Sequence, residues 1–186
     1  MAVAPNGGKQ EKIGNDLITT FKQNKTMKKM IFAALALLIS SVAMAQIPSV
    51  KVEDGKGKVF NTAQLVDGTT PMIISFWGVT CKPCIRELDA INDLYPDWIE
   101  EAKFRIVAVS TDDARHTAQA RSLAEGHGWS DYTLLYDKNG DFKRAMNVQF
   151  TPQIFIVDKK GEIVYSHTGY TPGGEYELFE IIKKLQ

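Results

Sequence analysis

The chain has 186 residues, of which 44% are hydrophobic, and this length suits one domain with a single core. It carries 22 basic and 22 acidic side chains, but residues 1–45 hold six of the basic and two of the acidic ones, so residues 46–186 keep 16 and 20, a net charge of −4. That acidic excess argues against nucleic acid as a partner.

The N-terminal part has the pattern of a secretory signal peptide. Two lysines precede the apolar run Ile31–Ile39, and the small residues of Ala43-Met-Ala45 precede Gln46. We therefore expect residues 27–45 to be a signal peptide that is cleaved near Ala45-Gln46, which implies a periplasmic or other extracytoplasmic location. A retained membrane anchor is the alternative, although the apolar run is shorter than the ~20 residues that a membrane-spanning helix needs.

Residues 1–26 precede this segment and are polar and rich in turn-forming residues. A secretory leader seldom has so long an extension at its start. We interpret residues 1–26 as a non-native segment upstream of a true start at Met27, with a disordered extension as the alternative. The fold is then expected within residues 46–186.

The first elements of this domain are short. Residues 50–60 alternate in polarity around Asp54-Gly55, which indicates a β-hairpin. Residues 61–65 are expected to form one helical turn. The apolar run at 72–77 predicts a strand that is covered on both faces.

A long amphipathic helix is expected from Pro83 to about Glu101. Pro96 lies inside it and should kink the helix or break it in two. Apolar residues recur at helical spacing and form one stripe, made of Cys84, Leu88, Ile91, Leu94 and Trp98.

From residue 104 onward the pattern continues to alternate between strands and helices. Asp112 or Asp113 is expected to cap the next helix, which ends near Glu125. Strands alternating with helices, followed by a terminal hairpin and helix, predict an α/β sandwich with a mixed sheet. The other elements expected here are strands at 104–110, 132–136, 152–158 and 162–166, and helices at 141–146 and 174–185.

The two cysteines of the chain, Cys81 and Cys84, lie between the strand at 72–77 and the long helix. With this spacing one thiol attacks a disulfide of a partner and the other resolves the mixed disulfide. We expect Cys81 to be the nucleophile, because the unpaired N–H groups and the dipole at a helix N-terminus favour the thiolate. Cys84, one turn into the helix, is the expected resolving thiol.

A buried structural pair and half of a zinc site are the alternatives for these cysteines. Two cysteines so close together constrain the unfolded chain little. A structural zinc ion needs four ligands, whereas the histidines at 116, 127 and 167 are scattered along the sequence. We therefore expect a redox pair with no metal and no cofactor.

The two residues between the cysteines also suit a helix start. Pro83 fixes its backbone angle there and lacks an N–H group that would have no partner in the first turn. Lys82 is expected to be exposed and to influence the local field, with an ordinary solvated lysine as the alternative.

Together these motifs resemble the periplasmic TlpA-type thiol–disulfide oxidoreductases, which have the thioredoxin fold. The likeness implies a thioredoxin-like three-layer sandwich over residues 46–186, with a mixed sheet of four or five central strands, an N-terminal hairpin and an inserted helix–strand unit around 112–136. It extends over residues 50–170 and rests on Phe76-Trp77, Cys81-Lys-Pro-Cys84 with Glu87, Val107–Ser110, Tyr136-Asp137, Thr151-Pro152, Phe155–Asp158 and Gly169-Tyr170.

The resemblance assigns roles to residues outside the cysteine motif. Thr151-Pro152 matches a cis-proline that faces the dithiol, where the backbone of Thr151 would pair with an extended substrate; a trans proline at a strand start is the alternative. Glu87 matches an acid that manages the proton of the buried cysteine, with a surface glutamate as the alternative. Trp77 is expected to pack beside the dithiol and, with Lys82, Pro83, Thr151 and Pro152, to form the substrate-binding surface.

Two positions depart from the pattern of this family. Ser75 stands where thioredoxin has a buried aspartate, which leaves Glu87 as the local proton carrier. Thr80 replaces the tryptophan that commonly precedes the first cysteine, so part of the usual hydrophobic contact surface is missing. The second departure bears on the choice of partner, and the fold is unaffected.

The resulting prediction is an envelope enzyme that exchanges its dithiol with disulfide- or dithiol-containing proteins, as a reductant more than as an oxidant. An upstream thiol–disulfide electron donor would serve it, and a membrane would be involved only through a retained anchor. Two other functions of the same fold stay open: a copper-delivery protein that uses His167, although the cysteine spacing argues against it, and a thiol peroxidase, which usually has a lone reactive cysteine.

Overall fold

The strands and helices of the structure lie close to the predicted ranges. The computed structural model describes residues 45–186, so the predictions for residues 1–26 and 27–44 lie outside the described part. The strands are β1 (Lys51–Asp54), β2 (Val59–Asn61), β3 (Met72–Trp77), β4 (Arg105–Ser110), β5 (Thr133–Tyr136), β6 (Gln153–Val157) and β7 (Ile163–Thr168). The helices are η1 (Thr62–Leu65), α2 (Lys82–Glu101), α3 (Thr117–Gly126), α4 (Asp141–Ala145) and α5 (Glu175–Lys183). In residues 45–186, no helix combines the length and the apolar character needed to span a membrane.

All seven strands belong to one mixed sheet, in the order β2-β1-β5-β4-β3-β6-β7. The strands β3, β4 and β5 run parallel, and their neighbours on both sides are antiparallel. The five strands β5-β4-β3-β6-β7 agree with the expected four or five central strands, and the predicted N-terminal hairpin extends the sheet because β1 pairs with β5 (Glu53 opposite Tyr136). The inserted unit α3–β5 provides the strand to which the hairpin attaches.

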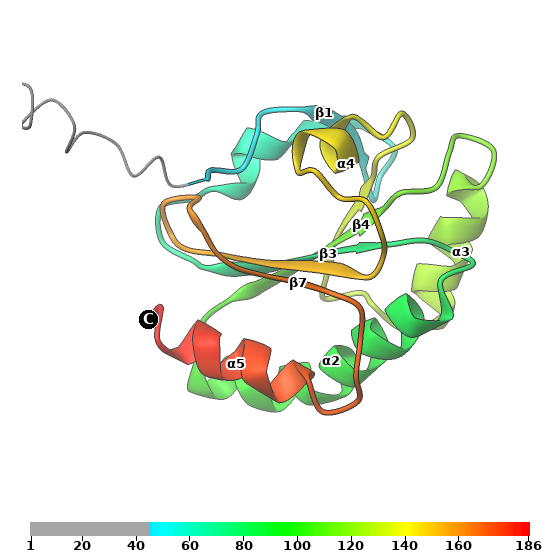
Figure 1. The fold of residues 1–186 in the computed structure, drawn as a ribbon. Coiled ribbons are helices and arrows are strands. Elements are labelled where there is room, and N and C mark those ends of the chain that lie inside the picture. The colour runs from blue at the N-terminus through cyan, green and yellow to red at the C-terminus, as the bar shows by residue number, and fades with distance from the viewer. Residues whose placement is uncertain (1–44) are drawn as a thin grey trace, which may run out of the picture. The chain divides into compact units, whose positions relative to one another are not determined.

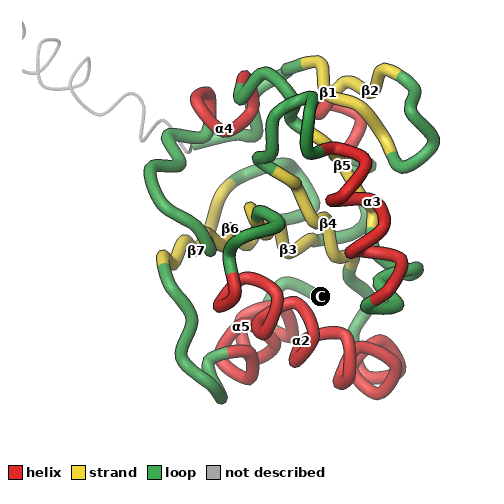
Figure 2. Tube along the Cα trace, turned by 90° about the vertical axis from the view of Figure 1, so that its right-hand side faces the viewer, coloured by secondary structure: helices red, strands yellow, loops and turns green. Residues whose placement is uncertain are grey.

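Helices cover both faces of this sheet, which gives the predicted three layers (Figures 1 and 2). Side chains of β3 alternate between the two cores, as the period of two in a strand requires. Ile73 and Trp77 face the core that includes residues of α2, α3 and α5. Met72, Ile74 and Phe76 face the other core, to which η1 and α4 contribute.

The helix α2 is continuous over 20 residues, so the prediction that Pro96 divides it is wrong. Pro96 is exposed, and water can therefore hydrate the carbonyl group that its missing N–H leaves without a partner. The opposite side of the helix is held in the core, where Trp98 stacks on Phe179 of α5 with ring centroids 4.5 Å apart. This packing keeps the helix in register across the proline.

The prediction that Asp112 or Asp113 caps the following helix is also wrong. The helix α3 begins at Thr117 with His116 at its cap position and no side-chain cap. Asp113 instead organises the turn before it, where its carboxylate accepts the backbone N–H groups of Arg115 and His116 (3.0 and 3.3 Å). Asp112 makes its hydrogen bonds elsewhere, to Ser110 and to the loop that follows β3.

Candidate active site

Cys81 and Cys84 form a disulfide where the chain passes from β3 into α2, with their Cα atoms 5.3 Å apart. Cys81 is partly exposed, whereas Cys84 is fully buried. The exposed residue is therefore the one that a partner can reach. This difference fits attack by Cys81 and resolution by Cys84.

The local backbone places Cys81 at the N-cap of α2, followed by the exposed Lys82 and the half-buried Pro83. The carbonyl of Cys81 accepts the N–H of Ile85 (3.2 Å), which closes the first helical turn. No side chain caps this helix end. The positive end of the helix dipole thus remains available to a thiolate on reduced Cys81.

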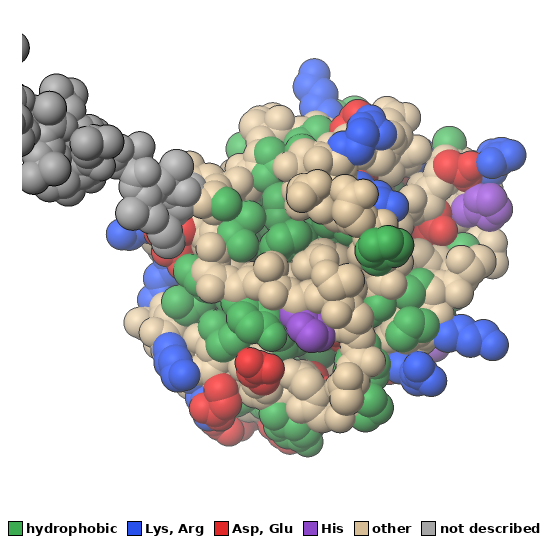
Figure 3. Space-filling view, in the orientation of Figure 1, with side chains coloured by type: hydrophobic (Ala, Val, Ile, Leu, Met, Phe, Trp, Pro, Cys, Tyr) green, Lys and Arg blue, Asp and Glu red, His purple; other side chains and the backbone are tan. Residues whose placement is uncertain are grey.

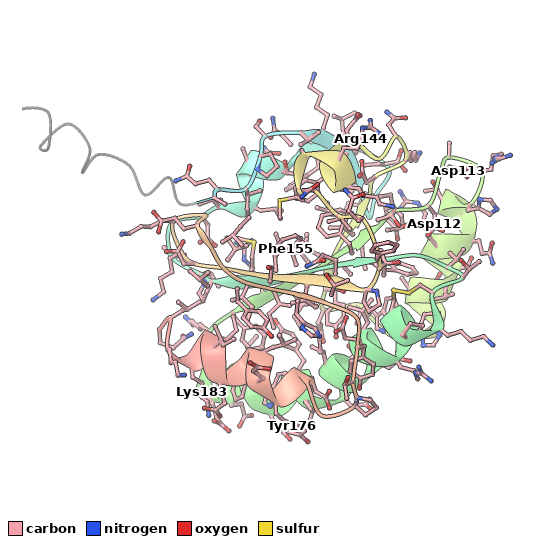
Figure 4. The ribbon with its side chains drawn as sticks, viewed as in Figure 1. Asp112, Asp113, Arg144, Phe155, Tyr176 and Lys183 are labelled. Carbon is pink, nitrogen blue, oxygen red and sulfur yellow. A yellow bond between two sulfur atoms is a disulfide. The ribbon has the colours of Figure 1, made fainter. Side chains whose placement is uncertain are left out.

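The loop before Cys81 is held by Asp112, which follows β4. Its carboxylate accepts the backbone N–H of Val79 (3.1 Å) and the hydroxyl of Ser110 (2.8 Å). Figure 4 shows Asp112 beside Asp113 on the loop that leads into α3. Sequence reasoning missed this role. The signal that could have found it is the parallel pairing of β3 and β4, because Trp77 opposite Ser110 places the residues after one strand beside those after the other.

The Thr151-Pro152 peptide bond is cis, as the resemblance implied. Gln153 pairs with Phe76, so this dipeptide lies at the end of β3 from which the cysteine loop departs. The carbonyl of Pro152 accepts the N–H of Gly169 (2.8 Å). The backbone of Thr151 makes no hydrogen bond to the described residues and stays available for an incoming chain.

Glu87 is buried one turn below Cys84, with 3% of its surface exposed, so the surface-glutamate alternative is wrong. Its Oε2 atom has no hydrogen-bond partner among residues 45–186. Burial, and then the negative charge of Glu175, raises the pKa of Glu87 to about 8. The carboxyl group therefore holds a proton at neutral pH.

Glu175 is a second buried carboxyl group near Glu87, and sequence reasoning missed it. It lies in the first turn of α5, 7% exposed, where it accepts the N–H of Gly173 (3.0 Å) and the hydroxyl of Tyr170 (3.3 Å). A hollow of about 140 Å³ lies beside Glu87, lined also by residues of β7, α5 and the loop that joins them, including His167, Tyr170 and Gly174. Water in this hollow can exchange protons with Glu87.

Trp77 lies behind the dithiol with no exposed surface, in the same core cluster as Cys84. Its ring meets that of Trp129 edge to face, with centroids 5.1 Å apart. Any contribution of Trp77 to binding would therefore act through the shape of the site. Ser75 is buried as well, and its hydroxyl has no partner in the described chain.

The histidines do not join the cysteines. His116 and His127 bond to Asp113 and Asp89 (2.8 and 2.9 Å), and His167 pairs with Ile154 in the sheet. Across residues 45–186, no three or more His, Cys, Asp or Glu side chains are grouped so that they could hold a metal ion. This arrangement does not favour the copper-delivery alternative.

The sequence model of the AhpC/TSA family matches residues 44–166, from just before the hairpin into β7. The chain belongs to the AhpC/TSA family. The matched segment contains both cysteines, Glu87 and the cis-proline. Glu175 and the rest of α5 lie beyond it.

Two relatives of this chain have names that describe thiol–disulfide chemistry. The chain is 32% identical over 98 residues to the thiol-disulfide oxidoreductase ResA of Geobacillus kaustophilus, which is 53% of this chain and 54% of that protein. It thus spans about half the length of that relative. It is 29% identical over 154 residues to the thiol:disulfide interchange protein DsbE of Yersinia pestis, 81% of this chain and 78% of the other.

A solved structure supports the fold of this AhpC/TSA-family chain. A thioredoxin-like protein from Porphyromonas gingivalis is 49% identical, with a TM-score of 0.68, and the alignment covers 76% of this chain and 92% of that one. The thioredoxin-like architecture predicted from the cysteine motif and its flanking elements is therefore confirmed.

Proposed function

We propose that this chain is a thiol–disulfide oxidoreductase that reduces disulfides of partner proteins. The observation that supports the proposal is the Cys81–Cys84 pair at the start of α2, with Cys81 partly exposed and Cys84 buried. The names of the ResA and DsbE relatives fit this chemistry.

In the reductive direction, the thiolate of Cys81 attacks one sulfur of the partner's disulfide. A mixed disulfide forms, and the partner's second sulfur leaves as a thiolate that takes a proton from water. Cys84 then attacks the Cys81 sulfur, which releases the first partner sulfur as a thiolate and closes the intramolecular disulfide. Two electrons pass from the protein to the partner.

Glu87 is the base that this sequence of steps requires. Cys84 must lose its proton inside the core before it attacks, and Glu87 is the buried carboxyl group one turn away. A group whose pKa lies near the working pH is the most effective proton carrier. With a pKa of about 8, Glu87 is mostly protonated at pH 7, so it is the ionised fraction, which grows as the pH rises, that takes the proton of Cys84. The proton then sits on Glu87 in the disulfide form and leaves through the hollow beside it.

The partners in this proposal are disulfide-bonded proteins outside the cytoplasm, and a separate thiol–disulfide donor reduces the pair again. Residues 27–45 support the location, because they have the pattern of a signal peptide. The mass of the protein recovered from the envelope would test this part, since cleavage after Ala45 leaves Gln46 as the first residue.

A trapping experiment tests the exchange itself. Cys84→Ala removes the resolving thiol, so the mixed disulfide on Cys81 should accumulate and appear as a reducible, larger species on a non-reducing gel. Cys81→Ala should trap nothing. If neither variant captures a protein from an envelope extract, the exchange function is contradicted.

The direction of exchange is tested separately, by measuring the reduction potential of the Cys81–Cys84 pair. A potential among those of the most oxidising thioredoxin-like proteins would contradict the reductant role.

A further inference from the structure

Phe150 is an exposed aromatic residue that directly precedes the cis-proline dipeptide. Its side chain is 74% exposed, in a chain whose other phenylalanines near the sheet are largely buried. The loop from α4 to β6 carries it to the same end of the sheet as the loop from β3 to α2, which holds Cys81 (Figure 1). Hydrophobic side chains are visible at the surface at this end of the molecule in Figure 3.

The backbone on both sides of Phe150 is fixed. Val148 and Pro152 are buried. Asn147 adopts a left-handed conformation (φ 54°) that ends α4, and the N–H of Val148 bonds to the carbonyl of Lys143 (2.9 Å). The ring is thus presented to solvent by an ordered segment, and little entropy would be lost when a partner covers it.

The surroundings of Phe150 indicate which part of a partner polypeptide would contact it. The partner's cysteine must lie beside Cys81, and the pairing of Gln153 with Phe76 places the cis-proline dipeptide at the same end of the sheet. The free backbone of Thr151 can there pair with an extended segment. Consecutive residues of such a segment are about 3.3 Å apart. A side chain one or two residues from the partner's cysteine would therefore reach the residue next to Thr151, which is Phe150.

We propose that Phe150 is the docking contact for partner polypeptides and that it binds an apolar side chain one or two residues from the reacting cysteine. The proposal rests on the proposed function and specifies its substrates. The aromatic surface that Thr80 lacks before the first cysteine is, on this view, supplied from the other side of the dithiol. Aromatic residues in the centre of an interface commonly carry much of the binding energy.

The test uses two extended peptides, each with one cysteine linked by a disulfide to an aryl thiol. One peptide has leucine two residues from the cysteine, and the other has serine there. The pre-reduced protein attacks the peptide sulfur, the aryl thiolate leaves and is followed by its absorbance, and Cys84 then releases the peptide thiol. The symmetrical aryl disulfide alone serves as the small substrate.

We expect the second-order rate constant of the wild-type protein to be about tenfold higher with the leucine peptide than with the serine peptide, a typical effect of one well-placed apolar contact. Phe150→Ala should abolish that preference and leave the rate with the aryl disulfide unchanged, which also shows that the variant is folded. Phe150→Leu should retain most of the preference. The matched control Val59→Ala, at a residue 76% exposed on the far edge strand, should behave as wild type.

Each other outcome has a definite meaning. A Phe150→Ala variant that keeps the preference, or that slows all three substrates equally, overturns the docking role of Phe150. A wild-type protein that exchanges with both peptides at the same rate overturns the docking role and leaves the proposed function in place. A wild-type protein that exchanges with neither peptide overturns the proposed function, and the docking role with it.

Discussion

At the scale of single residues, the most consequential group is Glu87, a carboxyl group that the core keeps protonated. Its pKa of about 8 lies above the 4.5 of an unperturbed glutamate. Between these two values the folded protein binds a proton that the unfolded chain has lost. The free energy of unfolding therefore falls as the pH rises from about 4.5 to about 8, and is highest on the acidic side of that range.

Glu87→Gln should remove this dependence, because an amide does not titrate. We expect the oxidised variant to be more stable than wild type by about 4 kcal/mol at pH 7.5 and nearly equal at pH 4.5. Its exchange rate should fall by about 100-fold, since the core has lost its base. Denaturant unfolding at the two pH values and single-turnover kinetics check this. The exposed Glu100→Gln on the same helix should change neither quantity; equal stabilisation at both pH values would contradict the explanation.

Glu175 provides a separate test of the same site. It lies in the first turn of α5 and accepts two hydrogen bonds, and after burial its negative charge is the second cause that raises the pKa of Glu87. In Glu175→Gln that charge is absent, and the rise of the exchange rate with pH should move to lower pH by roughly one unit. The pH–rate profile measures it, with the exposed Glu180→Gln on the same helix as control. An unmoved profile would show that the two carboxyl groups are independent.

At the scale of elements, the junctions between strands and helices position the dithiol. Asp112 connects the end of β4 to the loop after β3 and holds the N–H of Val79. We expect Asp112→Ala to lower the free energy of unfolding by about 2 kcal/mol, the usual cost of losing hydrogen bonds to a charged group. Asp112→Asn keeps a hydrogen-bond acceptor, so its free energy of unfolding should fall by less than half of that amount. Chemical denaturation checks both, and the exposed Asp131→Ala should have the smallest effect; equal losses for all three would contradict the role.

The elements also show which features can be predicted from sequence. The strand β3 and the helix α2 were predictable, because a continuous apolar run and an apolar stripe are local patterns. The cysteine pair was predictable for the same reason. The functions of Asp112 and Glu175 depend on contacts between segments distant in the sequence, such as Val79 and Asp112, which are 33 positions apart. No local pattern distinguishes these acids from helix caps.

At the scale of the whole molecule, the seven-stranded sheet depends on how the hairpin attaches to the inserted unit. The carboxylate of Glu53 on β1 forms ion pairs with Arg121 of α3 and with Lys138 after β5. The guanidinium of Arg121 also lies over the ring of Tyr136, 4.1 Å from its centroid. Three segments therefore meet at one partly buried acid, far along the sheet from the dithiol.

The hydrogen bond from Lys138, together with Arg121, lowers the pKa of Glu53 below the 4.5 of an unperturbed glutamate. The stability that this carboxylate contributes is thus present above pH 4.5 and is lost as the pH falls through its lowered pKa. Glu53→Gln should therefore destabilise the protein by about 1 kcal/mol at pH 7 and by less at pH 3, a modest value because the pair is partly solvated. Thermal unfolding at both pH values measures the difference, with the exposed Glu125→Gln as control. Because the dithiol is held by other contacts, the exchange rate at pH 7 should stay within a factor of two of wild type; a larger drop would mean that the hairpin supports the active site as well as the sheet.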